Sequence, residues 1–428
     1  MKKLLIMGTS GGSRELAEEA RKCGIYTIAT DDLPYEQSAI KHYTDDCWSL
    51  SVDDFDALAE KCRQEKIDGA VNGASEWINA CTATLCERAG LPCVIRPELL
   101  TKITQKHTFK KLCKQYGVPV AKDYFVSDPP TQEELDAVRF PVVVKPVDRA
   151  GNVGLSFCHD RQELVKACEF ARSVSHCEEV IVEQMLSGYE FVAFYAMADG
   201  EMSLLSLMLC ASQPGYPSSC YFVNYSSTFH LDGYIRQVET PVRKMLKAEG
   251  CKDGVCMIQG FFHRADAHFY VTEMGYRLSG ELFAKPLKTI PGFDSYRWLI
   301  EAALGVRHTG KDLPHFDLEK PRGYACSYIL WSKTEGTVDR VEGMEEIAAM
   351  PGVSIHCIGK PGRTYRAFQY LMVITFCAAD CEEMFAFIRR VNRTIRFRDQ
   401  NGENPAIYFD DFDKIRETEK EAAAAEGE

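Results

Sequence analysis

One stretch of the chain, Phe140–Phe157 (FPVVVKPVDRAGNVGLSF), combines a lysine with closely spaced glycines. An apolar run leads into Lys145, and a loop that contains Gly151 and Gly154 separates it from a second apolar run. That order predicts a strand, a turn and a strand. Glycines let a backbone approach a ligand closely, and successive N–H groups of such a loop can point at phosphate oxygens. Lys145 would add a positive charge beside them, although a hairpin of this composition is also an ordinary surface feature.

Three further stretches accompany this hairpin in a fixed order. KHTFKKLCKQYGVPVAKDYFV begins at Lys106, VIVEQMLSGYEFVAFYA occupies Val180–Ala196, and FYVTEMGYRLSG occupies Phe269–Gly280. Together with the hairpin they resemble the motifs of the ATP-grasp superfamily of carboxylate–amine and carboxylate–thiol ligases, such as L-amino acid ligases and proteins like carbamoyl-phosphate synthase. The ordered matches cover about residues 99–304 and are far more specific together than any one of them.

The resemblance implies an ATP site built from these motifs. The glycine loop would cover the triphosphate, two glutamates would lie beside the adenine amino group and the ribose, and the segment after Glu183 would hold the adenine ring. The implied nucleotide-binding residues are Lys106, Lys145, Gly151, Asn152, Gly154, Glu183, Gln184, Met185, Leu186 and Glu190. Without the resemblance, Lys106 is one of several exposed lysines and Glu190 is a strand carboxylate that faces water.

The same resemblance implies a site for Mg²⁺ or Mn²⁺, formed by Glu273 and Gln259. A strand-end carboxylate that bridges the metal to the phosphates, with Arg277 near the migrating phosphoryl group, provides the charge neutralisation and positioning that phosphoryl transfer needs. Lys145, Glu273 and Arg277 are therefore the implied catalytic residues. The family usually has an acidic residue where this chain has Gln259 and an asparagine where it has Gly275. Glutamine ligates through a neutral carbonyl, and glycine has no side chain.

Residues 1–98 are predicted to form a Rossmann-like domain. A strand over Lys3–Met7, a GTSGGS turn and a helix over Ser13–Cys23 open a βαβ unit, and Cys93–Ile95 is the predicted last strand of a parallel sheet of about four strands. The turn departs from the G-x-G-x-x-G pattern, so NAD binding with Asp31 on the ribose is the weaker interpretation. The resemblance instead makes this domain one wall of the substrate site.

Two further sets of side chains are candidates for the substrate site. The loop Asn72–Trp77 follows a predicted strand, and open α/β sheets bind ligands at the carboxyl ends of their strands. Glu76 would then face the substrate, unless it is a solvated loop residue. Further on, an aromatic-rich passage either lines the pocket with Tyr216, Tyr221 and Tyr225 or packs them against one another in a hairpin.

The predicted fold class is a multidomain α/β and α+β protein. Its parts are a Rossmann-like pre-ATP-grasp domain (1–98), an ATP-grasp domain (99–313) with a nucleotide subdomain over about 124–186, a small C-terminal α+β domain (314–413) and a charged tail or frayed helix (414–428). A single helix over Thr101–Tyr116 is predicted to carry Lys106. In the C-terminal domain, Arg363 and Arg366 either hold a substrate carboxylate or are surface arginines.

Composition narrows the class of protein and of partner. With 46% apolar and 26% charged residues among 428, the chain is that of a globular protein of two to four domains. A formal net charge of −12 argues against a nucleic-acid partner. No stretch approaches the roughly 18 to 20 apolar residues of a membrane span, no signal segment opens the chain, and the 18 cysteines include no CxxC pair. We expect a cytoplasmic protein with reduced thiols that acts on small molecules; a homodimer is compatible with this.

The resemblance implies an ATP-dependent carboxylate–amine ligase that forms an amide through an acyl phosphate and releases ADP and phosphate. Because of Gln259 and Gly275, a non-catalytic ATP-binding protein is an alternative. A carboxylase-type relative that uses bicarbonate is another, although no lysine stands in the alanine–methionine context of a biotin carrier. An NAD-dependent oxidoreductase based on the first domain is the most distant alternative.

Overall fold

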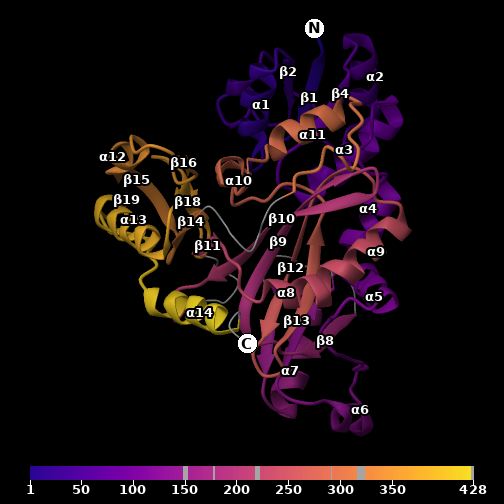
Figure 1. Ribbon diagram of the computed structural model, residues 1–428, viewed down its shortest axis with the longest axis vertical. Coiled ribbons are helices and arrows are strands. Elements are labelled where there is room, and N and C mark those ends of the chain that lie inside the picture. The colour runs from indigo at the N-terminus through magenta and orange to yellow at the C-terminus, as the bar shows by residue number, and fades with distance from the viewer. Residues whose placement is uncertain (148–152, 177–178, 217–221, 291, 316–322, 426–428) are drawn as a thin grey trace.

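The computed structural model describes residues 1–147, 153–176, 179–216, 222–290, 292–315 and 323–425. Figure 1 shows an N-terminal part at the top, long strands through the middle, and a C-terminal lobe in orange and yellow at one side. A small sheet with its own helices lies at the bottom of the same view.

The N-terminal part is a parallel sheet in the order β3-β2-β1-β4. Its strands and helices are β1 (Lys3–Met7), α1 (Ser13–Lys22), β2 (Tyr26–Thr30), β3 (Asp46–Trp48), α2 (Phe55–Glu65), β4 (Gly69–Asn72) and α3 (Glu76–Ala89). The prediction of a strand over Cys93–Ile95 was wrong. The fourth strand of the parallel sheet is β3, which lies at its edge. Pro92 has no N–H for a ladder, and the Cys93 thiol donates to the Ile95 carbonyl (2.9 Å), which closes a local turn.

A long antiparallel sheet forms the middle of the molecule, in the order β13-β12-β9-β10-β11-β14-β18-β16, with β20 beside β14. Its strands are β9 (Gly188–Ala198), β10 (Glu201–Ala211), β11 (Val223–Ser226), β12 (Gly254–His263), β13 (His268–Gly275), β14 (Tyr324–Ser332), β16 (Ser354–Cys357), β18 (Tyr370–Ala378) and β20 (Ala406–Ile407). Because β11 pairs with β14, the sheet that begins in the middle of the chain continues into the C-terminal lobe.

The small sheet at the bottom of Figure 1 has the order β5-β8-β6-β7. Its elements are β5 (Asp123–Tyr124), α6 (Gln132–Ala137), β6 (Val142–Pro146), β7 (Ser156–Cys158), α7 (Arg161–Val174) and β8 (Val180–Gln184). Val142 and Val144 of β6 pack against Leu164, Cys168 and Ala171 of α7, which bury one face of this sheet. The candidate functional residues of this sheet lie on its opposite face.

Two short helices replace the predicted single helix over Thr101–Tyr116. α4 (Pro97–Thr104) and α5 (Lys106–Tyr116) are separated by Gln105, whose backbone is extended (φ −69°, ψ 126°). Lys106 is therefore the first residue of its own helix. The remaining helices of the middle part are α8 (Leu231–Tyr234), the π-helical turn η2 (Ile235–Glu239), α9 (Thr240–Glu249), α10 (Ala284–Thr289) and α11 (Ser295–Ala303).

The C-terminal lobe adds β15 (Gly336–Glu342), α12 (Met344–Ala348), β17 (Thr364–Tyr365), α13 (Cys381–Thr394), β19 (Arg396–Asp399) and α14 (Phe412–Ala425). α14, predicted as a charged tail or frayed helix, is a docked helix that buries Ile415 and Thr418. Tyr189 of β9 and Tyr324 of β14 donate to its Glu421 (3.0 Å) and Glu419 (2.8 Å). Within the residues that the structure describes, no helix is both long and apolar enough to cross a membrane.

Candidate functional site

A cavity of about 650 Å³ lies between the small sheet and the long sheet. It is lined by eight of the residues predicted from the sequence: Lys106, Lys145, Glu183, Gln184, Leu186, Glu190, Gln259 and Glu273. Gly154, Met185 and Arg277 lie outside the lining, and Gly151 and Asn152 fall outside the described residues. Residues from motifs more than 160 positions apart are thus brought to one cavity.

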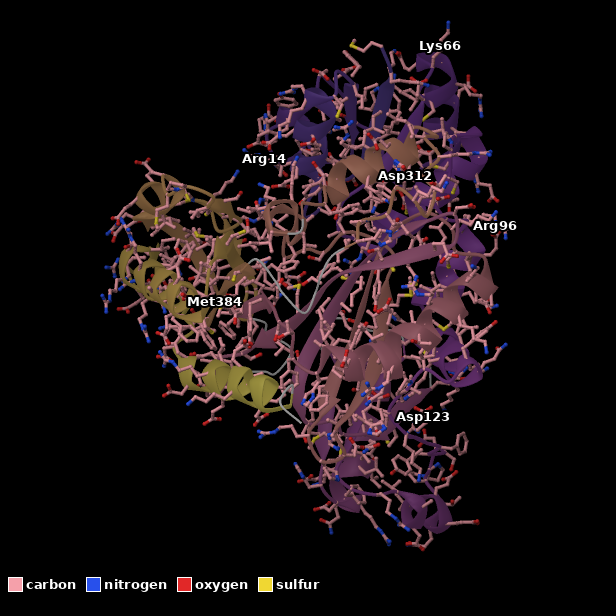
Figure 2. The ribbon with its side chains drawn as sticks, in the orientation of Figure 1. Arg14, Lys66, Arg96, Asp123, Asp312 and Met384 are labelled. Atoms are coloured by element: carbon pink, nitrogen blue, oxygen red, sulfur yellow. The ribbon has the colours of Figure 1, made fainter. Side chains whose placement is uncertain are left out.

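Lys145 and Glu183 form the charged centre of the small sheet. They lie on the neighbouring strands β6 and β8, and the Lys145 ammonium pairs with one carboxylate oxygen of Glu183 while Lys110 of α5 pairs with the other (2.8 Å). Burial alone would raise the pKa of Glu183, but these two lysines hold it below its usual value. Lys110 and Lys114 (2.6 Å) both pair with Asp123, labelled in Figure 2, which ties α5 to β5.

Lys106 begins α5 and is directed into the same cavity. Burial lowers the pKa of its ammonium, and the nearby positive charge of Lys145 lowers it further, while Glu273 and Glu183 act in the opposite direction. Lys106 and Lys145 thus bring two ammonium groups to the cavity, where they could contact the oxygens of a polyphosphate.

Apolar side chains line another part of the cavity. Val143, Leu155, Phe157 and Leu186 contribute to it, and half of the Phe157 side chain is exposed. Such a surface suits the faces of a flat base. The segment after Glu183 was expected to hold the adenine ring; its Met185 N–H donates to the Pro141 carbonyl (3.1 Å), so this group belongs to the fold of the strand end.

Gly154 has a backbone reason to be glycine. Its φ is +79°, and a Cβ at this position would lie 2.6 Å from Val174 Cγ2 and 2.9 Å from Pro146. Any other residue would be strained and would meet the packing between β6 and α7. Gly154 thus closes the predicted hairpin against the small sheet instead of lining the cavity.

Glu273 and Gln259 face each other across β13 and β12 and both line the cavity. Carboxylate and amide oxygens are hard donors of the kind that Mg²⁺ prefers, and Mg²⁺ commonly takes one or two carboxylates plus phosphate oxygens. In the described part of the chain, no three His, Cys, Asp or Glu side chains gather into a metal site by themselves. The pair therefore fits a metal that arrives with a nucleotide, and the phosphates would complete its shell.

Arg277 lies beyond β13, at the contact with the N-terminal domain. Its Nε lies 2.8 Å from Oε1 of Glu76, the first residue of α3, as an ion pair whose N–H is not aligned for a hydrogen bond. Burial raises the pKa of Glu76, Arg277 opposes that rise, and the charge of Glu273 adds to it. Glu76, predicted to face the substrate or solvent, thus stands close to both Arg277 and Glu273.

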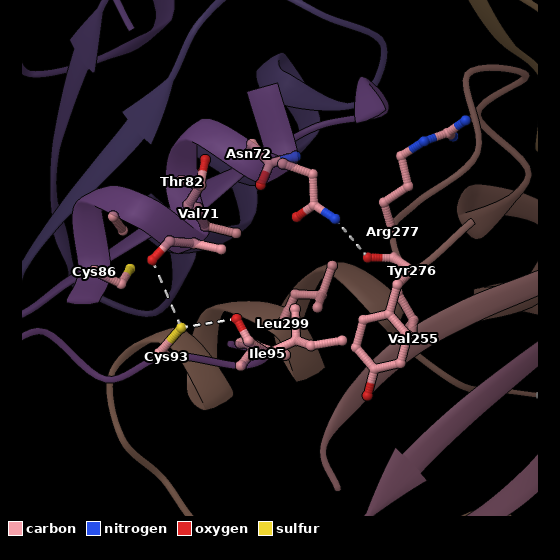
Figure 3. A pocket seen from close by; sticks show the side chains of 14 residues that line it. Val71, Asn72, Thr82, Cys86, Cys93, Ile95, Val255, Tyr276, Arg277 and Leu299 are labelled. Atoms are coloured by element: carbon pink, nitrogen blue, oxygen red, sulfur yellow. Dashed lines mark hydrogen bonds between the residues drawn. The ribbon is translucent and has the colours of Figure 1, made fainter. Parts of the chain in front are cut away.

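A second, much smaller cavity of about 40 Å³ lies behind this contact (Figure 3). It is lined by Cys86 and Cys93, by β4 residues and by Tyr276 and Arg277. Asn79 of α3 donates from Nδ2 to the Tyr276 carbonyl (2.9 Å), drawn as a dashed line in Figure 3. The cavity has room for about one water molecule and marks where α3 is fastened to the end of β13.

The other substrate candidates have different fates. Tyr225 of β11 was wrongly expected near the substrate: it is 1% exposed and lies in the main hydrophobic core, with its ring 6.0 Å from that of Tyr324. Tyr216 packs against Phe222 and Phe368, in agreement with the alternative that these aromatics pack together, and Tyr221 falls outside the described residues. Arg363 and Arg366 are exposed.

Lys414 is a cavity residue that the sequence did not indicate. It lies near the start of α14 and contributes to the lining of the large cavity. No local pattern distinguishes it, because its place depends on α14 docking on β9 and β14. The spacing of the buried Ile415 and Thr418, with Phe412 three residues before, is the helical signal that could have indicated a docked helix.

The middle of the chain, which supplies most of the cavity residues, matches a known protein family. Residues 105–307 match the family described as the carbamoyl-phosphate synthase L chain, ATP binding domain. A pyruvate carboxylase subunit of Methanothermobacter thermautotrophicus is 25% identical over 224 residues, which are 48% of this chain and 45% of that protein. The chain therefore spans less than half the length of this curated relative.

Two solved structures share the fold over nearly the whole chain. The L-amino acid ligase of Bacillus licheniformis has a TM-score of 0.75 at 21% identity, over 94% of this chain and 99% of that one. The biotin carboxylase domain dimer of the Hydrogenobacter thermophilus 2-oxoglutarate carboxylase, solved with MgADP, ADP and bicarbonate, has a TM-score of 0.72 at 17% identity, over 92% and 91%. At these identities the likeness establishes a mixed α/β multidomain fold, as the sequence predicted.

Proposed function

Because this chain belongs to the ATP-grasp superfamily, we propose that it is an ATP-dependent ligase that joins a small carboxylate to an amine, such as the amino group of an amino acid. The observation that carries the proposal is the large cavity. Lys106 and Lys145 line one side of it, and Glu273 and Gln259 line another. One wall supplies cations for phosphates, and the other supplies oxygens for a metal. The L-amino acid ligase of similar fold supports the choice of reaction class.

The residues that line the cavity would have different roles in such a reaction. The apolar lining would hold the base, Lys106 and Lys145 would hold the phosphates, and Glu273 with Gln259 would hold Mg²⁺. A bound Mg²⁺ would supply neutralisation of charge on the transferring phosphoryl group. The γ-phosphate would then face the contact between Arg277 and the N-terminal domain, where a carboxylate could attack it to give an acyl phosphate and ADP. The amine would attack the acyl phosphate and release phosphate.

Phosphate release across a panel of amino acids and small carboxylic acids, with mass detection of the product, tests this proposal. We expect release that requires ATP, Mg²⁺ and a matching pair of substrates, with an amide whose mass equals the two substrates minus water. Nucleotide binding without stimulated release by any pair would favour the non-catalytic binder, whose basis is the neutral Gln259 and the absent side chain at Gly275.

We also propose that two copies of the chain associate, since the biotin carboxylase domain of similar fold was solved as a dimer. Sedimentation equilibrium checks this directly. A mass of one chain, 48.2 kDa, at all concentrations would contradict it.

A further inference from the structure

The position of Gly275 is already filled by a side chain from another domain. Residues two apart along a strand point to the same side, so a side chain at 275 would share the face of β13 that carries Glu273. A Cβ on Gly275 would lie 2.8 Å from Met257 Cε and 3.0 Å from Glu76 Oε1. The carboxylate of Glu76 therefore stands where the side chain of residue 275 would be.

Several contacts hold Glu76 in that place. Ser75 caps α3 by accepting from the Ile78 N–H (3.3 Å), which fixes Glu76 as the first residue of the helix. One turn later, Asn79 donates to the Tyr276 carbonyl (2.9 Å), next to Gly275 itself. The Arg277 guanidinium then engages Oε1 of Glu76 from the other side (2.8 Å). The contact with Arg277 thus adds to the helix cap and the Asn79 hydrogen bond in placing Glu76 beside Gly275.

We propose that Glu76 supplies, from the N-terminal domain, the oxygen ligand for the divalent cation that residue 275 cannot supply. The inference rests on the proposed function, because the cation is the one that would accompany the nucleotide between Glu273 and Gln259. A carboxylate at this point also restores a negative charge that glutamine at 259 does not bring. The metal site is then complete only when α3 is docked on the end of β13, so the N-terminal domain is part of the catalytic site.

A double replacement tests the equivalence of the two positions. An asparagine at 275 would fill the space that Glu76 now occupies, so Gly275→Asn is best placed in a protein that also carries Glu76→Ala. The measurements are ADP affinity without metal, by calorimetry, and Mn²⁺ affinity of the ADP complex, from the electron paramagnetic resonance signal of free Mn²⁺. Glu87→Ala, at an exposed carboxylate of the same helix, is the matched control.

We expect Glu76→Ala to weaken Mn²⁺ binding at least about tenfold, the lower end of the range for residues that support a metal, with ADP affinity in the absence of metal unchanged. Glu76→Gln, which keeps the shape and one oxygen donor, should lie between Glu76→Ala and the wild type. Glu76→Ala with Gly275→Asn should recover most of the loss, and Glu87→Ala should behave as wild type.

Two results would overturn the inference while leaving the proposed function intact. One is normal Mn²⁺ affinity in Glu76→Ala, and the other is a double variant that binds Mn²⁺ no better than Glu76→Ala, each with ADP binding preserved. Wild-type protein that binds no ADP would contradict the proposed function and the inference together.

Discussion

The small sheet and the long sheet contribute to the large cavity in different ways. Lys145 and Glu183 of the small sheet, with Lys106 from the adjoining helix α5, come from one continuous part of the sequence, between residues 106 and 183. On the long sheet, Glu273 and Gln259 form a pair with a single charge, and the carboxylate that stands at the position of Gly275, Glu76, comes from the N-terminal part of the chain. The residues of the proposed phosphate site thus lie close together in the sequence, whereas the proposed metal site depends on how two domains dock.

The largest expected effect is on the long-sheet side. Glu273→Gln should abolish ATP turnover, because it removes the charged oxygen of the proposed metal pair while an exposed strand-end side chain contributes little to packing. Phosphate release measures the turnover, and the thermal unfolding midpoint shows whether the fold persists. Full activity in this variant would mean that the metal binds elsewhere.

The small-sheet side should respond in nucleotide affinity. Lys145→Ala is expected to weaken ATP binding by about 1.5–3 kcal/mol, the range for a hydrogen bond to a charged group. Calorimetry gives the value, and Lys114→Ala is the control, because Lys114 pairs with Asp123 and lies outside the cavity lining. Equal affinities for wild type and Lys145→Ala would remove the basis for a phosphate site on β6.

The pH dependence of ATP affinity distinguishes the contribution of Lys106 from that of Lys145. Since burial and Lys145 lower the pKa of Lys106, its ammonium loses its proton at lower pH than an ordinary lysine as the pH rises. ATP affinity should therefore begin to fall at lower alkaline pH in the wild type than in Lys106→Arg, whose guanidinium stays charged. Calorimetry between pH 7 and about 10.5, near the ordinary pKa of lysine, would show it. Superimposable pH profiles of the two proteins would contradict this.

The smallest effect is expected at the rim. Lys414 is exposed at the cavity, so Lys414→Ala should weaken ATP binding by no more than about 1 kcal/mol, as for other exposed charge pairs. Lys420→Ala, at an exposed lysine of the same helix that does not line the cavity, should have no effect. Equal losses in both variants would indicate a general charge effect.

Elements whose signals are local could be predicted from the sequence. The predicted strand Lys3–Met7 is β1 with the same bounds, and the predicted helix Ser13–Cys23 agrees with α1 to within a residue. The spacing of the buried Leu16 and Ala20 gives this helix one buried face. Eight of the predicted site residues line the large cavity, because the motifs that carry them could be identified in the sequence.

The features that the sequence could not predict depend on contacts between distant segments. Tyr225 is buried because side chains from distant segments, among them Tyr324, pack around it, and Lys414 reaches the cavity because α14 docks on the long sheet. The contact of Glu76 with Arg277 depends on the docking of α3, which Asn79 fastens to Tyr276, 197 positions away. Each of these placements is decided by tertiary packing, which local propensity does not encode.

The central claim, an ADP-forming ligation, is tested most directly by following ATP turnover with phosphorus NMR in the presence of a responsive acid and amine pair. We expect signals of ADP and inorganic phosphate in equal amounts, since the proposed geometry exposes the γ-phosphate beside Lys145, Glu273 and Arg277. Signals of AMP and pyrophosphate would contradict an ADP-forming ligation, because they would mean that the carboxylate attacks the α-phosphate.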